Sequence, residues 1–595
     1  MPALSENALA ILERRYLLRD DAGAVVESPG ELWARVAAAL AKAEEPAQRG
    51  RWAERFEARM AALELLPNSP TLMNAGRERG QLAACFVLPI DDDLASIFDG
   101  LKWAALIHQS GGGTGFSFSR LRPKGDLVRT THGVASGPVS FIRVFDAATE
   151  TIKQGGVRRG ANMAVLRVDH PDVLEFVDAK RGPGLANFNI SVAVTDAFMA
   201  AARAGERFAL RHPATGAPTS TVDARELLER IAEAAWASGE PGLVYIDRVN
   251  ARNPTPDLAP FEAVNPCGEQ PLLPFEACTL GSVNLGLFVR GGAVDWDGLG
   301  ACVRDGVRML DDVLAVNTWP LPPVAEISRR NRKVGLGVMG WADLLIRLGV
   351  PYDEPAALAL GEELMGFVQR EAHAASEALA AERGPFPGWA TSAAAAAGER
   401  PRRNATVTTI APTGTLSVIA GCSSGIEPLF AVAYVRRALG DVNLEEEHPE
   451  LVRRLRALGA ESSLPRILAN GRVRGVPGVP ASVQSLFATA HDVRPDVHVR
   501  MQGVFQRHVD NGVSKTINLP REAAASAVRE AFLLAFELGC KGITVYRDGT
   551  REGQVLTRGL PGQGGACPQC AAPLVRSGGC ETCPSCGFAT CETTE

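Results

Sequence analysis

The stretch Met163-Ala-Val-Leu-Arg-Val168 is a short run of β-branched and aliphatic residues that lies between two helical patterns. Ile190-Ser-Val-Ala-Val194 and Ala405-Thr-Val-Thr-Thr-Ile410 have the same character and the same setting. Short apolar strands that alternate with helices are typical of an α/β fold in which most strands are parallel. No clear linker interrupts this pattern, so we predict one large α/β domain over residues 66–555.

The two ends of the chain differ from this body. Residues 1–65 carry apolar side chains at helical spacing, as in Leu32–Ala43 and Trp52–Met60, which predicts an N-terminal helical region. Glycine and proline gather before the C-terminal cysteines, and we expect a flexible linker over residues 556–566. The remaining residues, 567–595, are too few to fold by apolar burial alone.

Composition and charge exclude several classes of protein. The chain has 595 residues, of which 46% are hydrophobic and 22% charged, and this excludes disorder as its main state. The formal net charge of -6 gives no electrostatic basis for nucleic-acid binding. No apolar run is long enough to span a membrane and the N-terminus lacks a secretory signal pattern, so we expect a cytoplasmic protein with no membrane contact.

Half of the 12 cysteines are crowded at the C-terminus. In a reducing compartment, metal binding explains such a cluster better than disulfide bonds do. Two C-x-x-C pairs have the spacing of a four-thiolate structural zinc site, which would also supply folding free energy. The predicted zinc ligands of this cysteine-rich tail are Cys567, Cys570, Cys583 and Cys586.

Two tail cysteines remain after these four. Cys580 and Cys591 would form a dithiol that carries electrons by thiol–disulfide exchange. An alternative partition uses Cys580 with Cys583 as the second zinc pair and leaves Cys586 and Cys591. A glycine directly after Cys586 favours the first partition, because glycine lets backbone N–H groups turn toward the sulfur.

In the body, Asn265-Pro-Cys267-Gly-Glu269 places an amide, a thiol and a carboxylate at alternate positions. Alternate residues of an extended segment share one face, and the intervening proline and glycine favour a tight loop tip. Ionic cysteine catalysis usually requires a base such as histidine, and none lies nearby in the sequence. Taken alone, the motif is equally well explained as a loop with a buried cysteine and a capping glutamate.

Other motifs supply a context for this pentapeptide. Cys278 lies in Phe275-Glu-Ala-Cys-Thr-Leu-Gly-Ser-Val-Asn-Leu285, and Cys85 lies in Leu82-Ala-Ala-Cys-Phe-Val-Leu-Pro89. Ala411-Pro-Thr-Gly-Thr-Leu-Ser417 offers hydroxyls and backbone N–H groups to a phosphate after a β run. The basic, glycine-rich loop Gln154–Gly160 has a similar capacity to bind an anion.

Together with Gly539-Cys-Lys-Gly-Ile-Thr-Val-Tyr-Arg-Asp-Gly549, these motifs resemble the catalytic chain of ribonucleotide reductases, specifically the adenosylcobalamin-dependent class II. The resemblance runs from Leu66 to the cysteine tail in the family's order. It implies a ten-stranded α/β barrel with Cys267 on a loop inside it, preceded by the N-terminal helical region. A small zinc-ribbon-like module would follow at the C-terminus.

The resemblance also implies a role for each residue of the motif. Cys267 would become a thiyl radical and abstract the 3′ hydrogen of the ribose, and Glu269 would take the proton of the 3′-hydroxyl. Asn265 would hydrogen-bond to the sugar hydroxyls or to the ketone that forms. Cys85 and Cys278 would protonate the leaving water and end as a disulfide. A radical mechanism explains why Cys267 has no histidine partner.

Binding residues follow from the same resemblance. The substrate would be held by Ser69, Thr71, Ala84, Gly113, Asn265, Thr413, Gly414, Thr415 and Ser417. A deoxynucleoside triphosphate effector at a homodimer interface would select the base through Asp146, Lys153, Gln154 and Arg158. Asp146 has a second interpretation, as an ordinary surface acid on a helix.

Features of the other classes of this family are missing. Class I chains carry adjacent tyrosines near the C-terminus, whereas Tyr546 follows a valine, and no glycyl-radical motif of class III is present. We therefore expect adenosylcobalamin as the radical source, bound base-on because no Asp-x-His-x-x-Gly motif occurs, and no radical-generating subunit. The residues before Leu66 leave no room for an additional ATP-binding domain, so we do not expect dATP to control overall activity.

The expected substrates are ribonucleoside diphosphates, with a thioredoxin- or glutaredoxin-like protein as the external reductant. Two other hypotheses remain open. A simple thiol–disulfide oxidoreductase would not need Glu269 or the phosphate-binding turns. A zinc-ribbon interaction protein with a degenerate body is disfavoured by the intact Asn265–Glu269 motif. Removal of the tail distinguishes them, because a reductase retains a single turnover and a ribbon-only binder loses its function.

Overall fold

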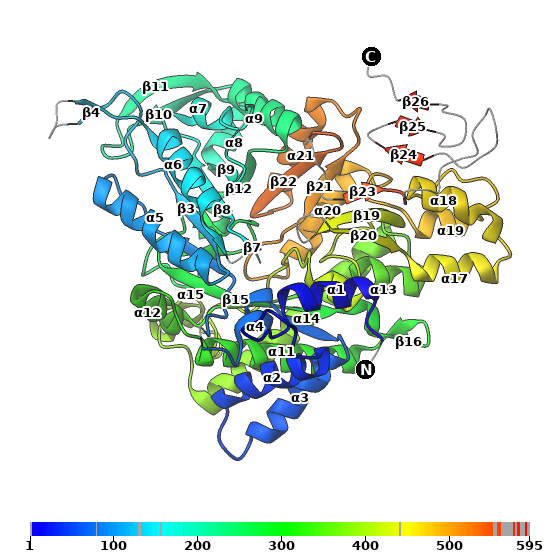
Figure 1. The fold of residues 1–595 in the computed structure, drawn as a ribbon. Helices are drawn as coiled ribbons and strands as arrows, with labels where there is room; N and C mark the ends of the chain where they lie inside the picture. Colours follow the sequence, from blue (N-terminus) through cyan, green and yellow to red (C-terminus); the bar gives the residue numbers. More distant parts are fainter. Residues whose placement is uncertain are drawn as a thin grey trace.

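The structure, a computed structural model, describes residues 3–78, 80–128, 133–154, 158–182, 184–438, 442–550, 556–560, 575–577, 580–582 and 589–591. A ten-stranded sheet lies at its centre. Helices surround this sheet, and the N-terminal helices gather on one side of it (Figure 1).

The sheet has two halves, each made of parallel strands. The strands of the first half, in their order across the sheet, are β2 (Cys85–Leu88), β3 (Gly113–Ser117), β8 (Asn162–Arg167), β9 (Phe188–Val194) and β12 (Gly242–Tyr245). The second half contains two parallel pairs, β15 (Glu276–Asn284) with β18 (Val334–Met339) and β21 (Thr516–Leu519) with β22 (Gly542–Arg547).

The two halves join into a closed ring. β12 pairs antiparallel with β22, and β15 pairs antiparallel with β2. Between β18 and β21, the segment 405–411 closes the ring through the parallel bridges Leu336↔Thr408 and Ile410↔Val513. A closed ring leaves no exposed sheet edge. The prediction that most strands are parallel is confirmed. The two junctions are exceptions, because the halves run in opposite directions there.

Parallel strands need long crossovers, and helices provide them on the outside of the barrel (Figure 1). In the first half these helices are α5 (Leu94–Gln109), α6 (Pro138–Thr151), α7 (Val173–Val177), α8 (Asp196–Ala204) and α9 (Ala224–Ser238). In the second half they include α11 (Trp296–Val316), α12 (Pro322–Asn331), α13 (Trp341–Leu348), α14 (Pro355–Arg383), α20 (Pro495–Gln506) and α21 (Ala525–Glu537).

The N-terminal region is helical, as its apolar spacing predicts. It contains α1 (Glu6–Arg15), α2 (Pro29–Leu40) and α3 (Arg49–Ala61). α2 starts at a capping box in which Ser28 and Glu31 satisfy each other's backbone N–H groups. The chain then enters the barrel through β1 (Leu65–Pro67), which pairs antiparallel with β15, and α4 (Ser69–Asn74).

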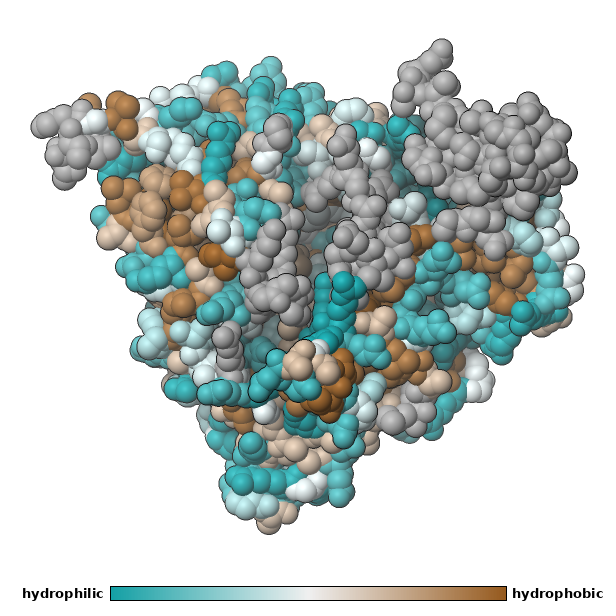
Figure 2. All heavy atoms as spheres, viewed as in Figure 1, coloured by the Kyte–Doolittle hydropathy of each residue, from teal (hydrophilic) through white to brown (hydrophobic). Residues whose placement is uncertain are grey.

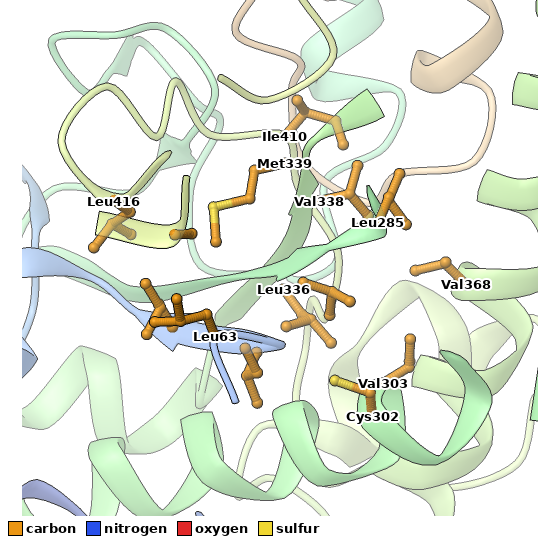
Figure 3. Packing of buried hydrophobic residues seen from close by; sticks show 14 of the residues in the cluster. Leu63, Leu285, Cys302, Val303, Leu336, Val338, Met339, Val368, Ile410 and Leu416 are labelled. Carbon is orange, nitrogen blue, oxygen red and sulfur yellow. The ribbon is translucent and has the colours of Figure 1, made fainter. Parts of the chain in front are cut away.

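The largest apolar core lies between the second half of the barrel and the helices outside it. Figure 3 shows Leu336 and Val338 of β18 packed against Val303 of α11 and Val368 of α14. Cys302, for which the sequence suggests no role, is one of these buried apolar side chains. This packing holds the second-half strands in place, and one of them, β15, carries Cys278.

A smaller subdomain follows the barrel segment 405–411. It contains α17 (Pro449–Ala457), α18 (Leu464–Asn470), α19 (Ala481–Leu486), β19 (Ala433–Ala438) and β20 (Val442–Glu447). β23 (Leu556–Arg558) pairs with β19, so the first residues of the predicted linker form a strand against the body. Among the helices of the described ranges, none combines the length and apolar character that crossing a membrane requires.

The shorter elements complete the fold. The helices among them are α10 (Ile246–Asn250), α15 (Ala393–Ala396) and α16 (Leu416–Ala420). The hairpins are β4 (Leu127–Val128) with β5 (Gly133–Val134), β6 (Lys153–Gln154) with β7 (Arg158–Arg159), β10 (Arg207–Arg211) with β11 (Pro218–Asp223), and β16 (Val289–Arg290) with β17 (Ala293–Val294). Three C-terminal strands are β24 (Val575–Ser577), β25 (Cys580–Thr582) and β26 (Ala589–Cys591).

Candidate active site

The motif that contains Cys267 forms the tip of a hairpin between β13 (Ala263–Val264) and β14 (Pro271–Leu272). Asn265 closes the turn, because its Oδ1 accepts a hydrogen bond from the Gln270 N–H at 2.9 Å. Gly268 has a φ of 81°, which glycine adopts readily. Asn265 and Glu269 are buried, whereas Cys267 is exposed at the tip. The predicted tight loop is confirmed.

The hairpin reaches the barrel interior because several facing positions lack a side chain. A Cβ on Gly115 would lie 1.9 Å from the Val264 carbonyl oxygen, and one on Gly113 would lie 3.0 Å from Pro266 Cγ. On the opposite side of the loop, a Cβ on Gly512 would lie 3.1 Å from the Glu269 backbone. These glycines come from both halves of the barrel, so the loop is held between them.

Cys85 and Cys278 face each other across the junction of the two halves. They are register partners in the antiparallel pair β2–β15, and both are buried free thiols. Directly opposed residues in such a pair have Cα atoms about 4.5–5.5 Å apart, which lies in the range that a disulfide spans. The Asn265 Nδ2 donates to Cys85 Sγ at 3.1 Å, which links the dithiol to the hairpin.

The Glu269 carboxyl group is suited to accept a proton near neutral pH. Its residue is 1% exposed, and Oε2 has no hydrogen-bond partner in the described part of the chain. Burial raises the pKa of Glu269 to about 7, and hydrogen bonds from its own backbone and from Asn265 oppose this only in part. Burial, together with the negative charge of Glu269, raises the pKa of Cys85, which keeps that thiol protonated.

The predicted substrate residues on and after α4 lie close to β2, the strand that begins at Cys85. Ser69 and Thr71 are in the first turn of α4, and Thr71 Oγ1 donates to the Leu82 carbonyl at 3.1 Å. The Thr71 hydroxyl is buried and therefore committed to the protein, whereas Ser69 Oγ shares a hydrogen bond with the Tyr16 hydroxyl at 2.7 Å. Ala84 is half-buried, and its carbonyl accepts from the Gly113 N–H at 2.8 Å.

The second predicted phosphate turn lies between segment 405–411 and α16. Thr413 has a positive φ of 52° and its Oγ1 accepts from the Gly425 N–H at 2.8 Å. Gly414 is exposed, with no atom near the position of a Cβ, and Thr415 is the N-cap of α16. Ser417 is buried and bonded to Ser424. Ala411, just before this turn, packs in one cluster with Cys85 and Cys278.

A cavity of about 550 Å³ lies on the exposed side of the hairpin tip. Its walls are β9, β12, β21 and β22, and Pro266–Gly268 form one boundary, so the exposed Cys267 borders the cavity. The sequence motifs do not predict this cavity. Small residues at its walls, Ser191, Gly242 and Gly542, are the signal that the sequence offers, and their meaning depends on strand pairing that is visible only in the fold.

The predicted effector residues come together on neighbouring elements. Asp146 lies on α6, and its Oδ1 accepts from the Asn187 N–H at 2.8 Å. Lys153 and Gln154 form β6, and Gln154 is the register partner of Arg158 in β7. α6 leads directly into β6, so all four residues belong to one helix–hairpin unit.

The predicted zinc ligands Cys567, Cys570, Cys583 and Cys586 lie outside the described residues. Within the described ranges, no group of three or more His, Cys, Asp or Glu side chains is arranged to hold a metal ion. The predicted shuttle residues Cys580 and Cys591 are register partners in the antiparallel pair β25–β26.

Two family models match most of the chain. The model described as "Ribonucleotide reductase, barrel domain" matches residues 83–401 and 395–546. The model described as "Ribonucleotide reductase, all-alpha domain" matches residues 3–80. Among solved structures, the class Id ribonucleotide reductase alpha subunit of Actinobacillus ureae has a TM-score of 0.75 and 23% identity, with 92% of this chain and 97% of that chain covered. This likeness supports the fold.

Curated relatives are more similar in sequence. A protein of Mycobacterium tuberculosis named "Vitamin B12-dependent ribonucleoside-diphosphate reductase" is 48% identical over 596 residues, which cover 99% of this chain and 84% of the relative. A protein of Thermoplasma acidophilum with the same name is 44% identical over 619 residues, which cover 93% of this chain and 80% of the relative.

Proposed function

Because this chain belongs to the ribonucleotide reductase family, we propose that it is a vitamin B12-dependent ribonucleoside-diphosphate reductase whose reaction is centred on Cys267. The observation that carries the proposal is the position of Cys267 between two environments. On one side it faces a cavity of about 550 Å³, and on the other its hairpin contacts Cys85 through Asn265. A radical source and a reductant can therefore reach one thiol from opposite sides.

The cavity suits the cobalamin cofactor that the names of the relatives indicate. Cys267 lies at its boundary, and small residues, among them two glycines and a serine, lie in its walls. Residues of β9, β12, β21 and β22 would hold the cofactor. When bound, adenosylcobalamin supplies a radical by homolysis of its cobalt–carbon bond. Tyr546, a single tyrosine after a valine, lines this cavity, where a class I chain has a tyrosine pair.

The residues of the chain then divide the reduction among them. The Cys267 thiyl radical takes the ribose 3′ hydrogen. Glu269 takes the 3′-hydroxyl proton through its buried Oε2, which has no hydrogen-bond partner among the described residues. Asn265 positions the sugar. One thiol of the Cys85–Cys278 pair donates the proton with which the 2′-hydroxyl leaves as water. The Cys85 and Cys278 thiols supply two electrons and become a disulfide, and the second of their two hydrogens ends on C2′. Glu269 gives its proton back to the 3′ oxygen, and Cys267 returns the hydrogen to C3′ and is a thiyl radical again.

The α4 turn and the turn before α16 are the proposed substrate phosphate sites. Ser69 and Thr415 offer hydroxyls to the phosphates, and Gly414 leaves open space where a side chain would stand. Thr71, Thr413 and Ser417 support the two turns through their own hydrogen bonds. Ala84 and Gly113 line the proposed substrate site between the dithiol and the hairpin.

We also propose a homodimer formed through α5 and α6. Figure 2 shows an apolar patch over these helices. Leu94, Phe98 and Leu106 of α5 are 62%, 51% and 43% exposed, and Val144 of α6 is 41% exposed. A second copy is the occupant that fits, because α6 also carries Asp146 of the proposed effector site. The effector would then bind where the two copies meet, with Lys153, Gln154 and Arg158.

The cysteine tail would return electrons to the barrel. The backbone register of Cys580 with Cys591 supports a dithiol shuttle between these two residues. A thioredoxin- or glutaredoxin-like protein would reduce this shuttle. The zinc site at Cys567, Cys570, Cys583 and Cys586 rests on their spacing in the sequence.

An anaerobic assay of the purified chain tests the proposal. It contains CDP, dATP as effector and dithiothreitol, with adenosylcobalamin present or absent. Formation of deoxycytidine product only with the cofactor, and its loss in Cys267→Ala, is the expected result. Absence of product from all four ribonucleotides, as diphosphates and as triphosphates, would contradict the proposal.

A further inference from the structure

Three residues from neighbouring strands lie side by side at the junction of the barrel halves. Cys85 and Cys278 are register partners between β2 and β15. On the other edge of β15, Thr279 is the parallel partner of Val334. Lys333, the residue before Val334, therefore lies beside Cys278 and on the same face of the sheet. A cation thus stands next to one thiol of the dithiol and not next to the other.

Lys333 is a fully buried charged residue whose ammonium group contacts a carboxylate and an aromatic ring. Its Nζ lies 2.6 Å from Glu276 Oε2 and 4.4 Å from the centre of the Phe261 ring, and both charged side chains are 0% exposed. Asn331 Nδ2 and the Leu273 N–H complete the hydrogen bonds of the Glu276 carboxylate, at 2.6 and 2.8 Å. Burial of an ion pair costs desolvation free energy, and the reaction steps described above do not use this pair.

The two thiols have different electrostatic surroundings. Burial raises the pKa of Cys278, and of the remaining effects the largest is that of Lys333, which lowers it more than Glu276 raises it. Burial also raises the pKa of Cys85, where Glu269, Cys278 and Cys267 raise it further and only the hydrogen bond from Asn265 lowers it. Lys333 is therefore a positive charge that acts on Cys278, whereas no cation of the described residues is among the groups that shift the pKa of Cys85.

From this arrangement we propose that Lys333 is a positioning residue that makes Cys278 the leaving thiolate when a dithiol reduces the Cys85–Cys278 disulfide. The inference rests on the proposed function, which gives the two cysteines their redox role. It states which of the two cysteines leaves as the thiolate, and it gives the buried Lys333–Glu276 ion pair a role in the reaction.

The exchange then has a defined sequence. A thiolate of the reducing dithiol attacks Cys85 Sγ, because residue Cys85 is 5% exposed whereas Cys278 is 0% exposed. The Cys85–Cys278 bond breaks, and Cys278 leaves with the electron pair as a thiolate beside the Lys333 ammonium. The second thiol of the reductant attacks its own partner sulfur, which releases Cys85 and leaves the reductant as a disulfide. Both barrel thiolates then take up a proton.

The first test uses the wild-type chain and needs neither cofactor nor nucleotide. The full chain is oxidised with diamide and treated with glutathione in the presence of an alkylating agent, and the peptides are analysed by mass spectrometry. We expect glutathione on Cys85 and the alkyl group on Cys278. The reverse labelling would overturn the inference. Failure of Cys85 and Cys278 to form a disulfide would overturn both the inference and the redox role of the pair.

The second test measures the rate at which dithiothreitol reduces the same disulfide. The double variant Lys333→Met with Glu276→Gln removes both charges, and it should slow reduction about tenfold, because a less stabilised thiolate leaves more slowly. Lys333→Arg keeps the charge and should remain within about threefold of wild type. Arg35→Met with Glu27→Gln removes another buried ion pair, outside the barrel, and should not change the rate.

An unchanged rate in the Lys333 double variant would overturn the inference while leaving the reductase proposal intact. Equal slowing in the Arg35 control would do the same, because it would assign the effect to loosened packing. Loss of product in the cofactor-dependent assay with normal labelling at Cys85 would instead contradict the proposed function alone.

Discussion

Asn265 Nδ2 lies 3.1 Å from Cys85 Sγ, so the hairpin that carries the exposed thiol of Cys267 is anchored to the strand that carries half of the dithiol. The same side chain holds its own turn together through the Gln270 N–H. One amide therefore sets both the shape of the hairpin tip and its distance from the reductant. This arrangement explains why a short motif can organise groups that are far apart in the sequence.

Replacement of Asn265 should uncouple these two groups. In Asn265→Ala the buried Gln270 N–H loses its acceptor and Cys85 loses its donor, which costs about 1–3 kcal/mol of stability. We expect deoxynucleotide formation to fall by about 100-fold or more, because misplaced reacting groups lose orientation. Asn253→Ala is the matched control, since Asn253 is equally buried and holds a loop outside the site. Equal activity in the two variants would contradict this role of Asn265.

The pH dependence of the reaction should follow Glu269. Its pKa is raised to about 7, and it must be ionised to accept a proton, so kcat/KM should rise with pH up to about 7 and then level off. Glu269→Gln should reduce turnover by about 10²- to 10⁴-fold and remove this rising limb. A rising limb of the same midpoint in the Gln variant would assign the titration to another group.

The same shift has a consequence for stability. The pKa of Glu269 is higher in the folded chain than its ordinary value of 4.5, so folding favours the neutral carboxyl group. Its contribution is present below about pH 4.5 and is lost as the pH rises through about 7. Thermal unfolding should therefore show Glu269→Gln gaining stability relative to wild type between pH 5 and pH 8.

Much of this architecture can be predicted from local sequence. The helices near Leu32 and Trp52, the parallel strands at Met163 and Ile190, and the loop around Cys267 are each encoded by their own neighbours. Register is not encoded locally. The opposition of Cys85 to Cys278 and the placement of Lys333 beside Cys278 depend on how β2, β15 and β18 align, and no single segment contains that information. The cavity is invisible in the sequence for the same reason.

Gly115 is predicted to be essential for the insertion of the hairpin. A methyl group there would lie 1.9 Å from the Val264 carbonyl oxygen, and the backbone at that point cannot be displaced without moving the hairpin. Gly115→Ala should lower the free energy of unfolding by about 1–3 kcal/mol or more and abolish activity. Gly50→Ala, on α3 with open space around it, should be neutral or stabilising by up to about 1 kcal/mol. Denaturant titration of both variants measures the difference.

If Cys580 and Cys591 shuttle electrons, their loss should spare the first turnover and prevent the later ones. Cys580→Ser and Cys591→Ser should each form about one product per chain from the prereduced enzyme, because the barrel dithiol is intact. With a thioredoxin-like protein as reductant, multiple turnover should fall at least about tenfold, whereas a small dithiol should restore part of it. Cys540→Ser is the control, since Cys540 is buried in an apolar cluster of the barrel domain and not in the tail. Full turnover with the protein reductant in both tail variants would exclude this pair as the shuttle.

If the apolar patch on α5 is the dimer interface, a change there should abolish both dimerisation and the response to the effector. Phe98→Glu places a charge on a side chain that is 51% exposed, so the folded monomer should tolerate it, while burial against a second copy would leave the carboxylate without a partner. We expect sedimentation to show monomers and the choice among ribonucleotides to become insensitive to the effector. Leu458→Glu is the matched control. Leu458 is 55% exposed and lies in the smaller subdomain, away from α5, so this variant should behave as wild type. A dimer that persists in Phe98→Glu would locate the interface elsewhere, and a monomer that still responds to the effector would separate the effector site from the interface.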